Sequence, residues 1–263
     1  MEATLAAARP GWGRPVRVFE SVTSTQDEAL LWARAGGPEG ALVVAERQTS
    51  GRGRAGRSWD SPPGRSLYLS IVVRPPPELA PGILTTAVGL GVAEAIETLY
   101  GLSTRLKWPN DVMVGGRKVA GVLVESELSS GRITAAAVGI GVNVAWKREE
   151  FPDTLRDRAT SIFLELGRPA LDPDDERVRL LVGLLQRVAA LYRLASTEGG
   201  DLIVKRATAR SDVLGRRVVV RLAGGQTIEG VATRLLADGA LEVKTSEGTE
   251  PVGSGEVAQV RAG

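Results

Sequence analysis

Neither cysteine nor histidine occurs among the 263 residues of this chain. The absence of cysteine excludes disulfide bonds and thiolate nucleophiles. The absence of histidine removes the commonest general base and the commonest metal ligand. We therefore expect no metal site built from protein side chains, and any catalysis must rely on carboxylates, lysine, arginine, hydroxyl groups and the backbone.

Long apolar runs are missing too. The longest strongly apolar stretch, residues 75–94, contains Glu78 together with several glycines and prolines, which makes it too polar to span a bilayer. The N-terminal residues hold no continuous apolar segment like that of a secretory signal. We expect a cytoplasmic protein that does not associate with membranes.

The chain also lacks a large charge of either sign. Its 33 lysine and arginine residues face 31 aspartate and glutamate residues, which leaves a formal net charge of +2. So small a net charge argues against affinity of the whole protein for nucleic acid. The hydrophobic content of 43% is high enough for a large buried core. These values describe a globular protein whose functional positive charge is local.

The most informative segment is QTSGRGRAGRSWDS at residues 48–61, which we call the Arg/Gly loop. Glycine lets the backbone adopt positive φ and approach a ligand closely, and arginine presents a fork of donors that matches phosphate or carboxylate. Similar sequences also occur in disordered nucleic-acid-binding tails. Here the segment lies between two strand-like runs, which favours an anion-binding loop inside a folded domain. Its glycines are Gly51, Gly53 and Gly56, and its arginines are Arg52, Arg54 and Arg57.

Apolar periodicity and turn residues predict an α+β body, in which helices pack against a mixed β-sheet. Ser24, with Asp27 three residues later, is a variant of the capping box that opens a helix. Gly115-Gly116 suits a hairpin turn with positive φ at both positions. The expected strands are 16–19, 41–46, 67–74, 106–114, 118–125 and 133–143, and the expected helices are 24–34, 85–99 and about 172–194.

After Leu214 the pattern changes to short strand-like segments separated by glycine-containing turns, which predicts a small β-barrel of the SH3 kind. These segments are residues 216–221, 227–235, 241–244 and 257–261. We accordingly divide the chain into a variable lead (1–15), a catalytic domain (16–212) and an SH3-like C-terminal domain (213–263).

Two further motifs contain residues suited to a ligand site. KWPNDV at residues 107–112 is followed by RKVAG at 117–121, where Lys118 emerges just after the turn and Gly121 permits close approach within a strand. GIGVNV at residues 139–144 places Asn143 at a strand end, where its amide can both donate to and accept from a purine edge.

Together these motifs resemble those of the biotin protein ligases, the biotin–[acetyl-CoA-carboxylase] ligase family. The resemblance covers most of residues 16–263 and rests on Ser24-Thr25, Gln48 and four motifs in order: GRGRxGRxWxSP, KWPND, RKxAG and GxGxN. It implies a fold like that of class II aminoacyl-tRNA synthetases and biotin synthetases. It also implies an ATP-dependent enzyme that forms biotinyl-5′-AMP and passes biotin to one lysine of a carboxyl carrier protein domain.

The resemblance assigns roles to residues, and it expects Mg²⁺ on the ATP phosphates. We assign catalysis to Arg52, Arg54, Lys118 and Asp111, the last as the group that orients or deprotonates the carrier lysine. The implied biotin-binding residues are Ser24, Thr25, Gln26, Gln48, Arg52, Gly53, Arg54, Lys118 and Gly121. The implied ATP-binding residues are Gly51, Arg52, Arg54, Arg57, Trp59, Lys118 and Asn143.

Several alternatives stay open. Asp111 can instead cap a turn, and Trp59 and Trp108 can belong either to the ligand site or to the core. Gln26 stands where many family members have asparagine, which leaves its reach uncertain. The competing functions are a lipoate or octanoate ligase of the same fold, and an RNA-binding protein that uses the Arg/Gly loop.

The lead of fifteen residues is too short for the winged-helix domain of the repressor members, so we expect no DNA binding. The resemblance leaves both a monomer and a homodimer open.

Overall fold

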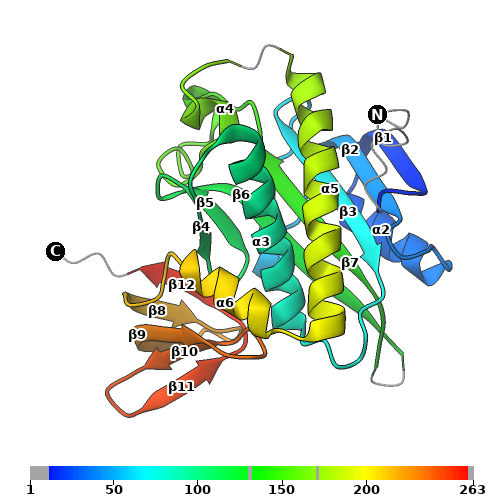
Figure 1. The fold of residues 1–263 in the computed structure, drawn as a ribbon. Helices are drawn as coiled ribbons and strands as arrows, with labels where there is room; N and C mark the ends of the chain where they lie inside the picture. The colour runs from blue at the N-terminus through cyan, green and yellow to red at the C-terminus, as the bar shows by residue number, and fades with distance from the viewer. Residues whose placement is uncertain (1–11, 130–131, 170–171, 260–263) are drawn as a thin grey trace.

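The computed structural model describes residues 12–129, 132–169 and 172–259. The strands of its main sheet are β1 (Val16–Val22), β2 (Leu42–Gln48), β3 (Ser66–Val73), β4 (Thr104–Lys107), β5 (Asp111–Val114), β6 (Arg117–Ser129) and β7 (Arg132–Asn143). They form one seven-stranded sheet in the order β1-β2-β3-β7-β6-β5-β4 (Figure 1). Strands β1 and β2 are parallel, and the other neighbours are antiparallel. The predicted mixed sheet is confirmed.

Helices cover the two faces of this sheet unequally. α3 (Pro81–Tyr100) and α5 (Pro173–Glu198) lie side by side over one face, and α2 (Thr25–Arg34) packs against β2, β3 and β7 on the other (Figure 1). Alternate strand residues divide between the faces. Val44 belongs to the large core beneath α3 and α5, whereas its neighbour Val43 packs with Ala29 and Ala33 of α2. The part of the second face that α2 leaves uncovered carries the candidate site.

Local sequence signals set the ends of these helices. Ser24 Oγ accepts a hydrogen bond from Gln26 N at the start of α2, and Asp172 Oδ1 accepts from two backbone N–H groups at the start of α5. α3 has a proline in its first turn and ends at Gly101, whose φ is 69°. The three predicted helices are therefore confirmed, although α3 begins four residues earlier than expected.

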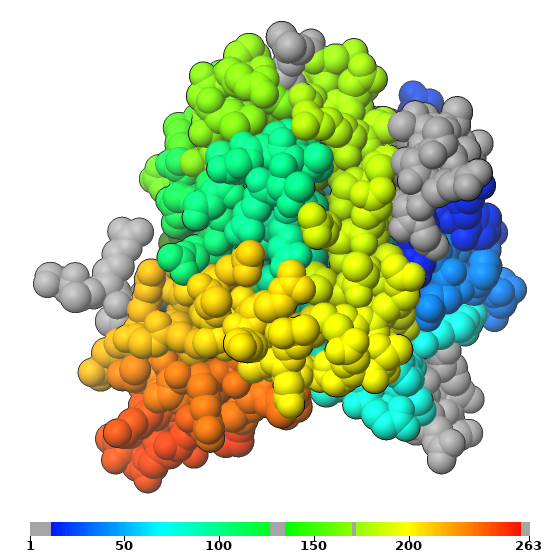
Figure 2. Space-filling model, viewed as in Figure 1, coloured from blue at the N-terminus to red at the C-terminus, as the bar shows by residue number. Residues whose placement is uncertain are grey.

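A second, five-stranded antiparallel sheet forms the C-terminal lobe, coloured orange to red in Figure 2. Its strands are β8 (Arg217–Arg221), β9 (Thr227–Leu235), β10 (Leu241–Lys244), β11 (Thr249–Val252) and β12 (Glu256–Gln259), in the order β11-β10-β9-β8-β12. The lobe follows α6 (Asp201–Ala209), which packs against α3 through the ion pairs Arg206–Glu94 and Arg210–Glu97. The predicted small β-rich unit is present, and the domain boundary near residue 213 stays a prediction.

The sequence analysis made several errors of detail. It predicted one strand over residues 106–114, but a turn at residues 108–110 splits it into β4 and β5, which pair with each other. It missed α4 (Ile162–Glu165), α6 and β11, which are short and carry weak local signals. Part of the lead, residues 1–11, and the end of the last expected strand, residues 260–261, lie outside the described residues.

Among the described residues, α3 alone is long and apolar enough to cross a membrane by length and composition, although it overlaps a stretch that we expected to be too polar. Of its most apolar window, 78% is buried. It packs against the sheet, α5 and α6. Core helices pass the same compositional test, so this feature does not indicate a membrane span.

Candidate functional site

Glycines form the floor of the uncovered sheet face. Gly121 of β6 lies opposite Gly141 of β7, and Gly139 occupies the next row on the same face. Because alternate residues share a face, the two rows lie about 7 Å apart along the strands. A Cβ atom at Gly141 would lie 2.6 Å from the Trp59 ring, and one at Gly139 would lie 2.6 Å from Gln26 Oε1. The glycines therefore let side chains pack directly against the backbone.

The Arg/Gly loop folds back on itself as a short hairpin whose Trp59 lies on this floor. Gly53 N donates to Arg57 O at 2.7 Å, and Trp59 N donates to Gly51 O at 2.9 Å. Of the three loop glycines only Gly56 has positive φ, at 72°. Gly51 is required for a different reason, because a Cβ atom there would lie 2.4 Å from Trp59 O. Of the two reasons for glycine that the sequence suggested, positive φ thus applies at Gly56 and close backbone approach at Gly51.

Four residues form what we call the cationic cluster: Arg54, Trp59, Asp111 and Lys118. Lys118 Nζ lies 2.6 Å from Asp111 Oδ1 and 5.0 Å from the centroid of the Trp59 ring. Burial lowers the pKa of Arg54, and the nearby carboxylate of Asp111 partly offsets this. An arginine remains charged nonetheless. Among the described residues Arg54 makes no ion pair within 4.0 Å, unlike the other two arginines of the loop. Its positive charge is therefore available to an anion.

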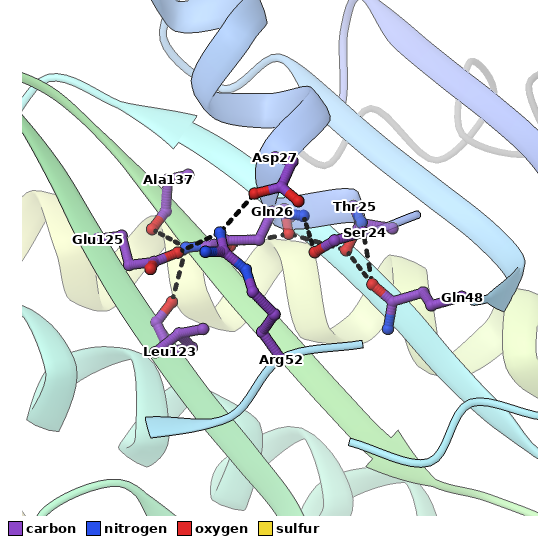
Figure 3. Close-up of polar contacts among 10 residues, drawn as sticks. Ser24, Thr25, Gln26, Asp27, Gln48, Arg52, Leu123, Glu125 and Ala137 are labelled. Carbon is purple, nitrogen blue, oxygen red and sulfur yellow. Dashed lines mark hydrogen bonds and ion pairs between the residues drawn. The ribbon is translucent and has the colours of Figure 1, made fainter. Parts of the chain in front are cut away.

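A second group, the polar network, begins at the N-terminus of α2 (Figure 3). It comprises Ser24, Thr25, Gln26, Gln48 and Ser70. The backbone N and the hydroxyl of Thr25 both donate to Gln48 Oε1, at 2.9 and 3.1 Å. Ser70 Oγ lies 2.9 Å from Thr25 Oγ1 and donates to Gln26 Oε1 at 3.0 Å. Neutral donors and acceptors of this kind suit an uncharged polar ligand group.

Gln26 links this network to the sheet. Its Nε2 atom donates to Ala137 O at 2.9 Å and to Leu123 O at 3.3 Å, so the amide bridges β7 and β6 (Figure 3). The side chain is 3% exposed. Its reach, which the sequence left uncertain, thus extends across two strands to the floor at Gly139.

The outer arginines of the loop are held by carboxylates. Arg52 Nη2 lies 2.7 Å from Asp27 Oδ1 and 2.8 Å from Glu125 Oε2 (Figure 3). Arg57 Nη2 lies 2.8 Å from Glu256 Oε1 of β12. The loop is consequently attached to α2 and β6 at one end and to the C-terminal lobe at the other.

Two predicted residues lie in more buried surroundings. Asn143 is 6% exposed, and its amide donates to Thr160 O at 3.0 Å and accepts from Ser66 Oγ at 3.4 Å. Trp108 belongs to the core of the C-terminal lobe, where its Nε1 donates to Gly239 O at 3.0 Å. For Trp108 the core alternative is therefore confirmed, and for Trp59 the structure gives a position on the glycine floor.

Sequence reasoning missed Ser70, Glu125 and Glu256 as members of the site. Ser70 had a usable signal, because a serine interrupts the apolar strand β3 opposite Gly139. The two glutamates had none, since their partners are distant in the sequence.

Comparison with known proteins agrees with these features. A model of the biotin/lipoate A/B protein ligase family matches residues 18–143, and one of the biotin protein ligase C-terminal domain matches residues 213–258. The biotin–[acetyl-CoA-carboxylase] ligase of Mycobacterium tuberculosis is 35% identical over 98% of this chain and 93% of its own length. The enzyme of that name from Paracoccus denitrificans is 34% identical over 89% of this chain and 96% of its own.

Among solved structures, the biotin protein ligase of Aquifex aeolicus in complex with biotin and ATP is similar with a TM-score of 0.79 and 32% identity. The match covers 95% of this chain and all of the other. The sequence motifs, the sheet with its C-terminal lobe and these relatives agree, and the chain belongs to the biotin protein ligase family.

Proposed function

We propose that this protein activates biotin with ATP and transfers it to a lysine of a carboxyl carrier protein domain. One observation carries the proposal: a neutral polar network and a cationic cluster lie on adjacent rows of one sheet face. Biotin has a neutral polar head and an anionic tail, so a ligand of this kind can extend from one group to the other. The relatives are named as biotin ligases, which favours biotin over lipoate or octanoate.

In the first step, a carboxylate oxygen of biotin attacks the α-phosphorus of ATP, and the bond to the leaving pyrophosphate breaks. The carboxylate is already ionised at neutral pH, so the step needs no general base. Its barrier comes from bringing one anion to another, and catalysis depends on cations in fixed positions. We assign this task to Arg54, which has no competing carboxylate within 4.0 Å among the described residues, and to Lys118.

In the second step, the amine nitrogen of the carrier lysine attacks the acyl carbon, the bond to AMP breaks, and the amine loses a proton. Asp111 is the carboxylate that we assign to orienting or accepting from this amine. Its ion pair with Lys118 makes it part of the cationic cluster, which supports the assignment.

We propose further that ATP is bound as its Mg²⁺ complex. Among the described residues no three acidic side chains gather into a metal site. Mg²⁺ in nucleotide sites is held largely by phosphates and water, with one or two carboxylates. We place the ion on the ATP phosphates, where it would offset their negative charge. We also propose the carrier domain as the partner and the cytoplasm as the compartment.

ATP–pyrophosphate exchange tests the proposal. Purified protein with Mg²⁺ is given biotin, lipoate, octanoate or no acid, and incorporation of labelled pyrophosphate into ATP is measured. We expect exchange with biotin alone. Exchange with lipoate or octanoate and not with biotin would refute biotin as the substrate. A folded protein that is inactive with every acid would refute the proposed adenylation reaction.

A further inference from the structure

Arg52 was assigned from the sequence to the ligand's carboxylate and phosphates, but its surroundings indicate another role. One nitrogen, Nη2, contacts both Asp27 at 2.7 Å and Glu125 at 2.8 Å (Figure 3). The guanidinium contributes one positive charge and the two carboxylates contribute two negative charges. The three groups together are therefore net negative, and a second anion brought to Arg52 would be repelled by two carboxylates.

The two carboxylates come from two different elements, α2 and β6, both of which the polar network contacts. Asp27 directly follows Gln26 in the first turn of α2, and Glu125 lies two residues beyond Leu123, whose carbonyl accepts from Gln26. Arg52 thus joins the Arg/Gly loop to the two segments that Gln26 already connects. Arg54 follows two residues later, so the ion pairs that anchor Arg52 also restrict the position of the Arg54 backbone.

We propose that Asp27, Arg52 and Glu125 form a clasp that holds the Arg/Gly loop closed over the site, and that all three are positioning residues. This inference rests on the proposed ligase function for its catalytic consequence, but the clasp itself can be tested without any ligand. Arg52 then acts through the loop, and contact with the anions is left to Arg54 and Lys118.

Trypsin provides the test that is independent of activity, because the loop contains three arginines at which the protease cuts. The variants Asp27→Asn, Glu125→Gln and the double variant keep all three cleavage sites. Cleavage after residues 52, 54 and 57 is followed by mass spectrometry in the ligand-free protein. Glu28→Gln is the matched control, since Glu28 is the next residue of α2 and makes no ion pair within 4.0 Å among the described residues.

If the clasp holds the loop, each single variant should be cut in the loop faster than the parent, and the double variant about five- to tenfold faster, as expected for the loss of two partly exposed ion pairs. The control should match the parent. Raising KCl to about 1 M should speed cleavage of the parent toward that of the double variant, because salt screens exposed charges. Thermal unfolding of each variant separates loop opening from global unfolding.

The catalytic consequence is measured with adenylate formed on the enzyme from biotin and labelled ATP. The double variant should release the adenylate about five- to tenfold faster than the parent, while its rate of forming it changes less than about threefold. Loop cleavage in the double variant equal to that in the parent would overturn the clasp. The clasp would also be overturned if the double variant lost more in its rate of adenylate formation than it gained in its rate of adenylate release. That result would make Arg52 and its partners part of the anion site. A parent without biotin-dependent exchange would refute the ligase function and leave the trypsin result to decide the clasp.

Discussion

Replacement of Trp108 should show that the C-terminal lobe supports the turn at residues 108–110 and the adjoining Asp111, which we call the catalytic turn. This residue lies in the KWPND motif between β4 and β5, yet its ring is 7% exposed within the core of the lobe. Its Nε1 atom donates to the carbonyl of Gly239, which is itself buried. Asn110 and Asp111 follow directly, and Asn110 Nδ2 donates to Val122 O at 2.8 Å. Trp108 therefore connects the lobe to the residue that pairs with Lys118.

The cost can be estimated from this burial. Trp108→Ala removes a large side chain from a small core and should lower the free energy of unfolding by about 3–5 kcal/mol. Trp108→Phe keeps most of the apolar contact but leaves the Gly239 carbonyl without its donor, which should cost about 1–3 kcal/mol. Exchange activity should fall by roughly tenfold or more in the alanine variant, since a small displacement of catalytic groups has effects of this size.

Urea denaturation followed by far-UV circular dichroism gives the free energies of unfolding. ATP–pyrophosphate exchange with biotin gives the activity, measured without urea at a temperature at which each variant is folded. Trp108→Phe serves as the matched variant because it separates the hydrogen bond from the packing. If the free energy of unfolding of Trp108→Ala lies within about 0.5 kcal/mol of that of the parent, as for an ordinary surface substitution, the burial argument fails. Lost stability with unchanged exchange would refute only the connection to the catalytic turn.

Three further predictions concern other parts of the molecule. Gly141→Ala should displace the Trp59 ring, because the new methyl would lie 2.6 Å from it, and should raise the KM for ATP about tenfold or more in exchange assays. Glu97→Gln should lower stability at pH 7 by about 1 kcal/mol in urea titrations. Burial raises the pKa of Glu97, but hydrogen bonds from Arg210 and a threonine outweigh it, so the folded pKa is lowered. That stabilisation is present above the unfolded pKa of about 4.3 and is lost as pH falls through the lowered folded pKa. The difference in free energy of unfolding between the two proteins should therefore shrink on acidification. Asp111→Asn should slow transfer from preformed adenylate more than threefold in single-turnover experiments, by about tenfold or more.

Contrary results would be informative in each case. An unchanged KM in Gly141→Ala would mean that the ring is not held in this position when ATP binds. A stability difference for Glu97→Gln that grows on acidification would reverse the sign of the linkage. A transfer rate for Asp111→Asn within threefold of the parent would remove its role as the group that orients or deprotonates the amine.

The sequence by itself determined the local features of this protein. Ser24 starts a helix, Gly101 ends one, and Gly115-Gly116 takes positive φ at both positions of a turn. Each of these signals lies within a few residues of the structure that it specifies, because caps and tight turns depend on neighbouring backbone groups. The motifs that indicate the family are likewise continuous stretches of chain.

Only the tertiary structure decided how those stretches are used. The partners of Arg52 are 25 and 73 residues away, and Gly239, which accepts from Trp108, is 131 residues away. Nothing within the Arg/Gly loop distinguishes Arg52, which two carboxylates hold, from Arg54, which makes no ion pair within 4.0 Å among the described residues. That difference arises because folding fixes which distant charges come within a few ångströms, and Coulomb energies and hydrogen bonds depend on that distance rather than on separation along the chain.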